Sequence, residues 1–119
     1  MFNILRENVI TNDINTIIDK GITIRGDING EENIRIDGTI EGNINLEGSV
    51  YIGESGCVIG NITATDLTIF GLVRGNVNIS NRLSICACGQ LEGDVITSSL
   101  NVETGGRFNG YSKMSPSFA

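Results

Sequence analysis

The chain contains no histidine and no tryptophan, and its single proline, Pro116, lies close to the C-terminus. Histidine is the usual general base of the acyltransferases built on β-solenoids and the usual zinc ligand of the solenoid carbonic anhydrases. Its absence excludes both enzyme classes, and the sequence offers no paired carboxylates that would replace it. We therefore expect a protein that is not an enzyme and that needs no cofactor.

Cysteine and positive charge are also scarce. The three cysteines, Cys57, Cys86 and Cys88, occur in a chain without a secretory signal, so we expect free thiols in a reducing cytoplasm rather than a disulfide framework. Without histidine or a fourth cysteine, a closed metal site would need carboxylates or water, and we expect no metal. Eight Lys and Arg stand against 14 Asp and Glu, a net charge of -6. This leaves no basic stripe for nucleic acid.

No segment approaches the ~20 consecutive apolar residues that a membrane-spanning helix needs. Glycine, in contrast, is abundant, with 16 residues. Many of these glycines stand in one motif: an aliphatic residue, any residue, Gly, Asn or Asp, and another aliphatic residue. The motif occurs as IRGDI, IEGNI, VIGNI, VRGNV and LEGDV, and FNGYS is a worn sixth copy. The central glycines are Gly26, Gly42, Gly60, Gly75, Gly93 and Gly110, with spacings of 16, 18, 15, 18 and 17 residues. This near-constant period is typical of a repeat protein.

A second motif, two aliphatic residues separated by one residue, keeps the same period, for example at Ile34 and Ile36. Alternation of this kind indicates strands with one buried face. About 17 residues are too few for a helix, a strand and two loops, but they match a coil of three short strands stacked ~4.8 Å from the next coil. A lone coil cannot offset its ordering entropy, so coils must stack. The sequence predicts an all-β, three-sided parallel β-helix of about six coils.

The handedness is predicted from the coil length. From Ile22 to Ala64 an apolar residue also falls at every sixth position, as in left-handed hexapeptide β-helices. That series then fails at Asn76 and Arg82, and the coil length varies between 15 and 18 residues. A hexapeptide coil would hold 18 residues throughout. The variation favours the right-handed form.

The Asn or Asp after each motif glycine is predicted to form a ladder along one corner. The residues are Asp27, Asn43, Asn61, Asn76 and Asp94. Calcium-binding solenoids carry a GGxGxD spacing, which this sequence lacks. We therefore favour a structural role, in which these side chains bond neighbouring backbone.

The residue before each motif glycine is predicted to point outward. This series reads Arg25, Glu41, Ile59, Arg74 and Glu92. Opposite charges on adjacent coils would pair and support the register more than the stability. The same mapping places Ile59, Phe70 and Leu72, with Cys57 and Cys86, outward and close together. Such an apolar patch marks contact with another chain; the alternative is that distortion tucks Phe70 or Leu72 inside.

The terminal coils of a solenoid expose strand edges and core unless a cap covers them. The last predicted coil is followed by a short Ser-rich tail without helical periodicity, and a partial coil starts near Thr16. Uncapped ends favour end-to-end stacking, and the product is a filament if the contact does not close a ring. The apolar residues that we predict for this interface are Ile18, Ile22, Ile24, Leu100, Val102 and Phe108.

Three segments resemble the start, middle and end of a bactofilin domain: NTIIDKGITIRGDI, IRIDGTIEGNI and RFNGYSKM. The resemblance runs from about Ile14 to Met114, in the family's order. It implies a bacterial cytoskeletal protein with a right-handed, three-sided β-helix that assembles without nucleotide into filaments joined head-to-head and tail-to-tail. It also implies a role in cell shape, often through enzymes that remodel peptidoglycan. A phenylalanine of the final coil supports polymer contacts in this family, and Phe108 occupies the matching position.

The repeat and the resemblance together divide the chain into a tail (1–13), a β-helix domain (14–112) and a disordered C-terminal tail (113–119). The resemblance implies that the first tail touches the membrane, and Phe2, Ile4 and Leu5 would make that contact. Arg6 and Lys20 are the only positive charges nearby, so attraction to anionic lipid would be weak. A disordered tail is the alternative. We expect the protein in the cytoplasm, at the inner face of the cytoplasmic membrane.

Two functions remain open from the sequence. The first is a scaffold that polymerises with itself, supports cell shape and positions cell-wall-modifying enzymes at the membrane. The second is a monomeric binding module that docks a partner through the lateral patch of Ile59, Phe70 and Leu72. Filaments in electron micrographs would favour the first, and discrete particles the second.

Overall fold

The computed structural model describes residues 16–114, and within this range every regular element is a strand. The first two coils contain β1 (Thr16–Ile18), β2 (Thr23–Arg25), β3 (Ile28–Gly30), β4 (Ile34–Ile36), β5 (Thr39–Glu41) and β6 (Ile44–Leu46). The middle coils contain β7 (Ser49–Ile52), β8 (Cys57–Ile59), β9 (Ile62–Ile69), β10 (Leu72–Arg74) and β11 (Val77–Ile85). The last part contains β12 (Gln90–Glu92), β13 (Val95–Val102), β14 (Arg107–Asn109) and β15 (Ser112–Met114).

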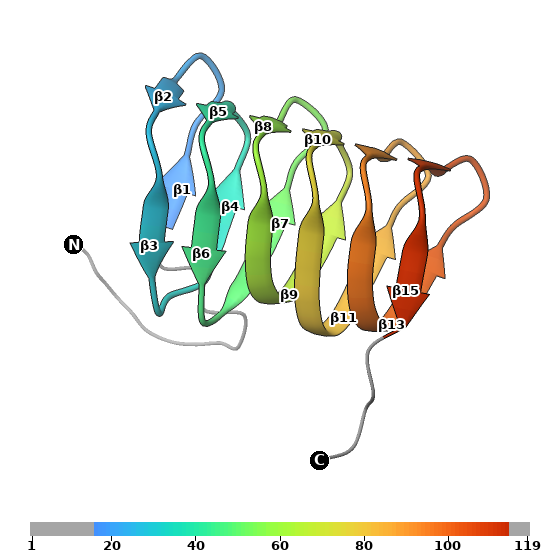
Figure 1. Cartoon of the computed structure of the whole chain (residues 1–119). Helices are drawn as coiled ribbons and strands as arrows, with labels where there is room; N and C mark the ends of the chain where they lie inside the picture. Colours follow the sequence, from blue (N-terminus) through green and yellow to red (C-terminus); the bar gives the residue numbers. More distant parts are fainter. Residues whose placement is uncertain (1–15, 115–119) are drawn as a thin grey trace, which may run out of the picture.

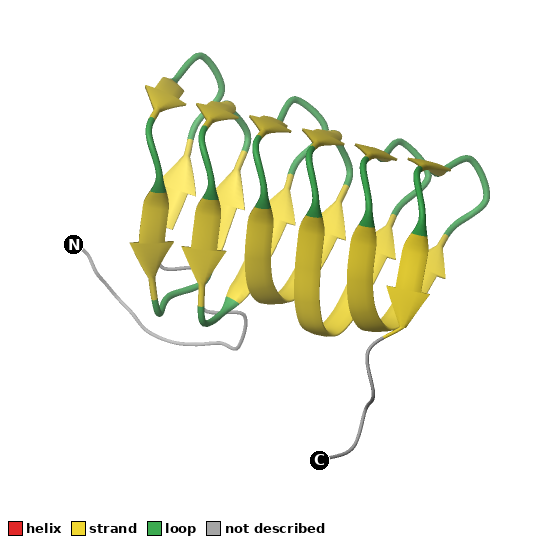
Figure 2. Ribbon diagram, in the orientation of Figure 1, coloured by secondary structure: helices red, strands yellow, loops and turns green. Residues whose placement is uncertain are grey.

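These strands stack into three columns of parallel pairs (Figures 1 and 2). The first column holds β1, β4, β7 and the second halves of β9, β11 and β13. The second column is β2, β5, β8, β10, β12 and β14, and the third holds β3, β6, the first halves of β9, β11 and β13, and β15. The three long strands bend from the third column into the first, which joins both columns in one sheet.

The pairing register reproduces the spacing of the sequence motif. In the second column the aligned residues are Ile24, Ile40, Val58, Val73, Leu91 and Phe108. Each is two residues before a motif glycine, so each strand step equals one motif spacing. The predicted all-strand parallel solenoid of about six turns, about 17 residues apart, is confirmed. The right-handed coil and the three-sided cross-section stay predictions.

Strand β15 runs to Met114, two residues beyond the domain boundary at 112 that the sequence predicts, and its residues Lys113 and Met114 pair with β13. Strand β1 begins at Thr16, the first described residue. The predicted tail of residues 1–13 lies outside the described residues.

The core is a single stack of aliphatic side chains that point inward from all three columns. Its most completely buried members are Ile36, Ile40, Ile44, Ile52, Ile62, Leu67, Ile69, Ile79, Leu83, Ile85, Leu91 and Val50. Each fully buried aliphatic side chain contributes ~1.5–3 kcal/mol. Since each coil has neighbours above and below in the middle of the stack, burial is complete there and declines toward the two ends.

The corner between the second and third columns has the same construction in every coil, a glycine followed by Asn, Asp or, in the last coil, Tyr111. Gly60 has a φ of +152°, and a Cβ there would overlap the carbonyl oxygen of Gly42 one coil below. Only glycine tolerates both conditions. The corner between the first and second columns, in contrast, has two residues after β4 and four after β7, so this corner contributes to the varying coil length.

The predicted ladder follows the glycines and is confirmed. The amides of Asn43, Asn61, Asn76, Asp94 and Tyr111 donate to the side-chain oxygens of Asp27, Asn43, Asn61, Asn76 and Asp94, at 2.9–3.2 Å. Each bond joins one coil to the next. The ladder therefore fixes the register of consecutive coils at this corner, as a backbone-bonding role for these side chains requires.

Candidate self-association surfaces

The N-terminal end of the stack is the first coil, β1 to β3, whose strands pair with described strands on one side only. Ile24 and Ile28 point inward and are partly buried against the core. Ile22 is 49% exposed at the corner before β2. Ile18 is only 6% exposed, so it already belongs to the core and leaves little surface for a second copy. Sequence reasoning missed Ile28, although it is the second aliphatic residue of the first motif copy.

The C-terminal end consists of the second half of β13 with β14 and β15, which also pair with described strands on one side only. Phe108 is aligned with the fully buried Leu91 of β12 but is itself only partly buried, because no described strand follows β14 in its column. Leu100 is partly buried against the core, and Val102 is exposed. All three predicted residues thus lie on the last coil.

Tyr111 is the most exposed large apolar side chain among the described residues, at 83%, and sequence reasoning did not assign it to the interface. It occupies the corner position that Asn or Asp holds in the other coils. This departure from the repeat is the sequence feature that could have identified Tyr111 as a candidate interface residue. Because a tyrosine has its only side-chain oxygen at the far end of the ring, it cannot extend the ladder as Asn or Asp does.

The predicted lateral patch divides between two places. Ile59 is 45% exposed on β8, and Leu72 is half-buried on β10, directly beside Cys57. Phe70 instead lies at the corner after β9, where its ring packs against Tyr51 with centroids 5.0 Å apart and planes tilted by 35°. Whether either part binds a partner stays a prediction.

The prediction that Cys86 points outward is wrong, because its side chain is only 7% exposed. Cys86 follows β11 directly, and its amide donates to the carbonyl of Ile69 at 2.9 Å. The tight turn that follows is closed by the amide of Gly89, which donates to the Cys86 carbonyl at 2.8 Å. Burial raises the pKa of the Cys86 thiol, with smaller contributions from Glu103 and Cys88.

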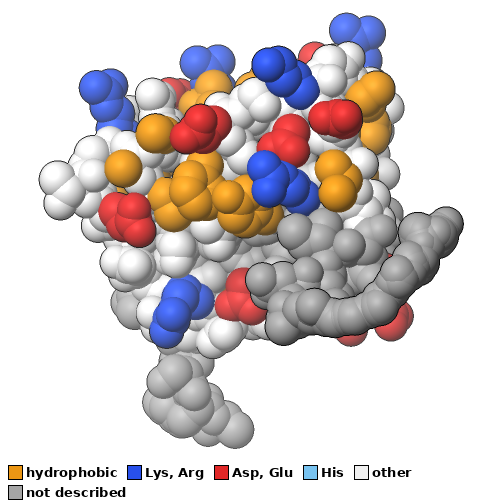
Figure 3. Space-filling view, turned by 180° about the vertical axis from the view of Figure 1, so that it is seen from behind, with side chains coloured by type: hydrophobic (Ala, Val, Ile, Leu, Met, Phe, Trp, Pro, Cys, Tyr) orange, Lys and Arg blue, Asp and Glu red, His pale blue; other side chains and the backbone are white. Residues whose placement is uncertain are grey.

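Tyr51, on the outer face of the first column, forms a cluster with Phe70 of the adjoining corner and with Arg35. The guanidinium of Arg35 lies 4.9 Å from the centre of the Tyr51 ring, a cation–π distance. Its Nε also donates to Asp37 at 2.9 Å, a hydrogen bond that raises the pKa of Arg35. Figure 3 shows hydrophobic side chains gathered on this face with both signs of charge around them.

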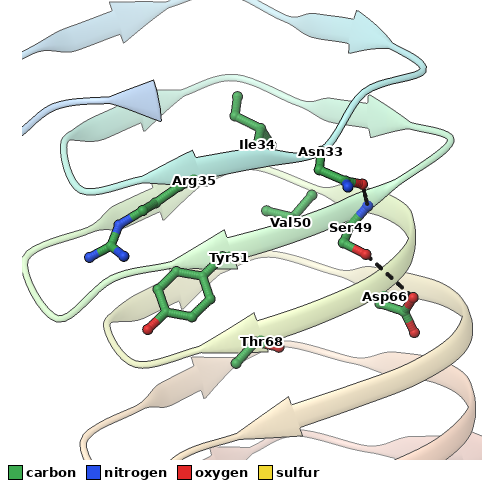
Figure 4. A pocket seen from close by; sticks show the side chains of 8 residues that line it. All are labelled: Asn33, Ile34, Arg35, Ser49, Val50, Tyr51, Asp66 and Thr68. Carbon is green, nitrogen blue, oxygen red and sulfur yellow. Dashed lines mark hydrogen bonds between the residues drawn. The ribbon is translucent and has the colours of Figure 1, made fainter. Parts of the chain in front are cut away.

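A shallow pocket adjoins this cluster (Figure 4). Tyr51 and Arg35 border one part of it, and Ser49 and Asp66 lie in the other part. In that second part, the Ser49 hydroxyl hydrogen-bonds Asp66 at 3.4 Å, and the Ser49 amide donates to the side-chain oxygen of Asn33 at 2.9 Å. The sequence indicated Arg35 and Tyr51 only indirectly, as the middle residues of two consecutive aliphatic-x-aliphatic motifs.

Comparison with known proteins identifies the family of this chain. The family model "Bactofilin: Polymer-forming cytoskeletal" matches residues 16–113. The chain belongs to the bactofilin family. It is 33% identical over 96 residues to Bactofilin BacO of Myxococcus xanthus (strain DK1622), an alignment that covers 81% of this chain and 76% of the relative. The resemblance inferred from the sequence is therefore confirmed.

Solved bactofilin structures share the fold. A cryo-EM reconstruction of Thermus thermophilus bactofilin double helical filaments superposes with a TM-score of 0.76 at 27% identity, covering 84% of this chain and 99% of that one. The solid-state NMR structure of the cytoskeletal bactofilin BacA gives 0.75 at 29% identity, covering 84% and 95%. A crystal structure of a Thermus thermophilus bactofilin with a phenylalanine-to-arginine substitution gives 0.70 at 25% identity, covering 74% and 98%.

As a bactofilin, this chain belongs to a structural, polymer-forming family. Among residues 16–114, no group of three or more His, Cys, Asp or Glu side chains is placed to hold a metal ion. None of the described residues forms a helix that is long and apolar enough to cross a membrane. The predicted membrane contacts Phe2, Ile4 and Leu5 lie outside the described residues.

Proposed function

We propose that this bactofilin assembles end to end, through its first and last coils, into nucleotide-independent filaments that support cell shape. The observation that carries this proposal is the pair of ends of the described stack, residues 16–114. At each end, three strands have an edge that no described strand pairs with, and their aliphatic or aromatic side chains are only partly buried. Such edges attract further strands, and a second copy would complete both the pairing and the core.

The ladder of Asn and Asp supports joining of like ends, head-to-head and tail-to-tail. In a head-to-tail stack, the corner of the last coil would have to accept a hydrogen bond from the Asp27 amide of the next copy. Tyr111 holds that corner and offers no acceptor near the backbone. A head-to-tail contact would therefore interrupt a ladder that is continuous within the molecule, whereas contacts between like ends make no such demand.

Two variants test the end contact. Phe108→Arg places a charge on the last coil, and Thr63→Arg is the control, with the same charge at an exposed mid-stack position on β9. A charged guanidinium at Phe108 would have to be buried in the end contact, which is unfavourable without a partner. We expect negative-stain electron microscopy without nucleotide to show filaments for the unchanged chain and Thr63→Arg. Phe108→Arg should give discrete particles that keep the β-sheet circular dichroism of the fold. Intact filaments of Phe108→Arg would contradict the assignment of the end contact.

The same micrographs distinguish filament formation from the alternative function, a monomeric binding module. Ile59 and Leu72 leave an apolar area on the second column that a partner protein could cover. If the unchanged chain stays monomeric at high concentration, a binding module that docks through this area becomes the better account.

We further propose that the filament lies at the inner face of the cytoplasmic membrane and positions peptidoglycan-modifying enzymes there. This part rests on the family and on the apolar residues Phe2, Ile4 and Leu5. Sedimentation with liposomes compares the full chain with a chain that lacks residues 2–8, using neutral and anionic vesicles. Equal recovery of both chains with the vesicles would reject the membrane contact.

A further inference from the structure

The outer face of the second column carries a regular order of charge. Strands β2, β5, β8, β10 and β12 each contribute one outward residue at the same register position: Arg25, Glu41, Ile59, Arg74 and Glu92. Arg25 pairs with Glu41 at 3.1 Å, and Arg74 pairs with Glu92 at 3.3 Å. Ile59 separates the two ion pairs, and it is among the most exposed large apolar residues in the described part of the chain.

This order is complementary to itself when it is read in the opposite direction. A two-fold axis parallel to the strands and passing through β8 places Ile59 against Ile59 of a second copy. The same axis places Arg25 opposite Glu92 and Glu41 opposite Arg74. Each ion pair of one copy then faces the reversed ion pair of the other, so that every charge has neighbours of opposite sign. Self-complementarity of this kind defines a two-fold symmetric interface.

We propose that two copies of this chain pair side by side and antiparallel through the outer face of the second column, centred on Ile59. The parallel arrangement, with coils in register, would place Arg25 against Arg25 and Glu92 against Glu92. Like charges in direct opposition disfavour that alternative. The charge order thus selects both the face and the relative direction of the two copies.

The surroundings of Ile59 fit a contact with a second copy. On the same face, Leu72 of β10 is half-buried beside Cys57 of β8, so the centre of the face is apolar. The rim is charged. An apolar centre within a polar rim is the usual anatomy of a protein interface, and the symmetry axis would also bring Cys57 opposite Cys57.

The contact is small. With the axis at β8, five strands of each copy face one another, and at ~4.8 Å spacing and about 10 Å length they offer roughly 240 Å² per copy. A stable interface buries ~800 Å² per partner, so one isolated pair would be short-lived. In filaments the contact repeats at every subunit, and the effective concentration of the facing surfaces makes pairing stable. Stable lateral pairing therefore rests on the proposed end-to-end filament.

The first experiment exchanges charges without changing the net charge. Arg74→Glu with Glu92→Arg keeps an ion pair within the molecule but sets like charges against Arg25 and Glu41 of the facing copy. Adding Arg25→Glu and Glu41→Arg restores complementarity. We expect electron micrographs to show laterally paired filaments for the unchanged chain, single filaments for the double exchange and paired filaments again for the fourfold exchange. Paired filaments of the double exchange, as frequent as in the unchanged chain, would overturn the proposal.

The second experiment does not depend on filaments. In a Phe108→Arg, Cys88→Ser background, Cys57 is the accessible thiol, because Cys86 is buried. Facing sheets lie ~10 Å apart, a gap that a short bis-maleimide spans. We expect a cross-linked dimer at high protein concentration, loss of it on the double exchange, and recovery on the fourfold exchange. The control carries Thr63→Cys in place of Cys57.

Cross-linking of Cys57 that does not respond to the charge exchanges, or that the Thr63→Cys control matches, would refute the lateral pairing. Absence of filaments from the unchanged chain in the first experiment would instead count against end-to-end assembly. The two proposals therefore fail through different readouts.

Discussion

Single residues fix the corner at which each coil turns from the second to the third column. At Gly60 an added Cβ would meet both an unfavourable φ and the carbonyl of Gly42, whereas at Gly26, with a φ of +145°, it would meet open space. We expect Gly26→Ala to lower the free energy of unfolding by about 1–3 kcal/mol from backbone strain alone. Gly60→Ala should cost clearly more, because the overlap with Gly42 adds to that strain.

The measurement is urea unfolding followed by circular dichroism, with both substitutions made in the Phe108→Arg background. This background matters because assembly raises apparent stability by mass action. Equal losses for Gly60→Ala and Gly26→Ala would show that close packing of consecutive corners does not constrain this position.

The ladder makes a second prediction at the residue scale. The side chain of Asn61 accepts a hydrogen bond from the amide of Asn76 at 2.9 Å, in the middle of the stack. Asn61→Ala removes the acceptor, and we expect a loss of about 0.5–1.5 kcal/mol in unfolding free energy. Asn61→Asp retains an acceptor oxygen and should preserve most of the stability. If Asp and Ala prove equally destabilising, the hydrogen bond is not the reason for Asn at this corner.

At the scale of the strands, the same type of side chain contributes more to the free energy of unfolding in a middle coil than in an end coil. Ile24 on β2 and Ile40 on β5 are register partners, but Ile40 is fully buried and Ile24 only partly. Ile40→Ala should cost about 2–5 kcal/mol because it leaves a cavity. Ile24→Ala should cost about 1 kcal/mol in the Phe108→Arg monomer, given its partial burial.

Filament formation should be affected more by Ile24→Ala than by Ile40→Ala, the reverse of their effects on stability. Ile24→Ala removes surface from an end contact and should raise the protein concentration needed for sedimentable polymer, while Ile40→Ala leaves both ends unchanged. Pelleting assays over a concentration series measure this. A larger effect of Ile40→Ala on polymerisation would show that global stability, not the end surface, limits assembly.

The strand registers could be predicted from the sequence because each coil repeats the same motif around its glycine. Ile24, Ile40 and Phe108 share a column for that reason, and the alternation within each motif assigns them to the core. The residues whose positions the sequence did not predict correctly lie at the corner between the first and second columns. Cys86 is buried because a turn follows it directly.

Phe70 sits at the same corner and contacts Tyr51 instead of Ile59. The link between the first and second columns has two residues in some coils and four in others, so period-two alternation does not extend across it. The extent to which side chains of the end coils are buried could not be predicted from the sequence either. Ile18 and Ile24 both stand in the first coil, yet only Ile24 keeps a partly open surface.

At the scale of the whole molecule, the solenoid of residues 16–114 is incomplete at both ends. Its middle coils bury nearly all of their aliphatic side chains, while Phe108 at one end and Ile24 at the other are only partly covered. Residues 16–114 include no capping repeat, and a repeat protein must hide such surfaces in some way. In the proposed end-to-end filament, contact between copies would hide them without any nucleotide, because the free energy would come from burial and strand pairing.

The most direct measurement is a cryo-EM reconstruction of filaments grown from the purified, unmodified chain. The account predicts that the last coil of one copy stacks on the last coil of the next, with Phe108 buried in the contact, and that first coils meet in the same way. A reconstruction in which the terminal coils face solvent and the copies touch only through their sides would contradict it.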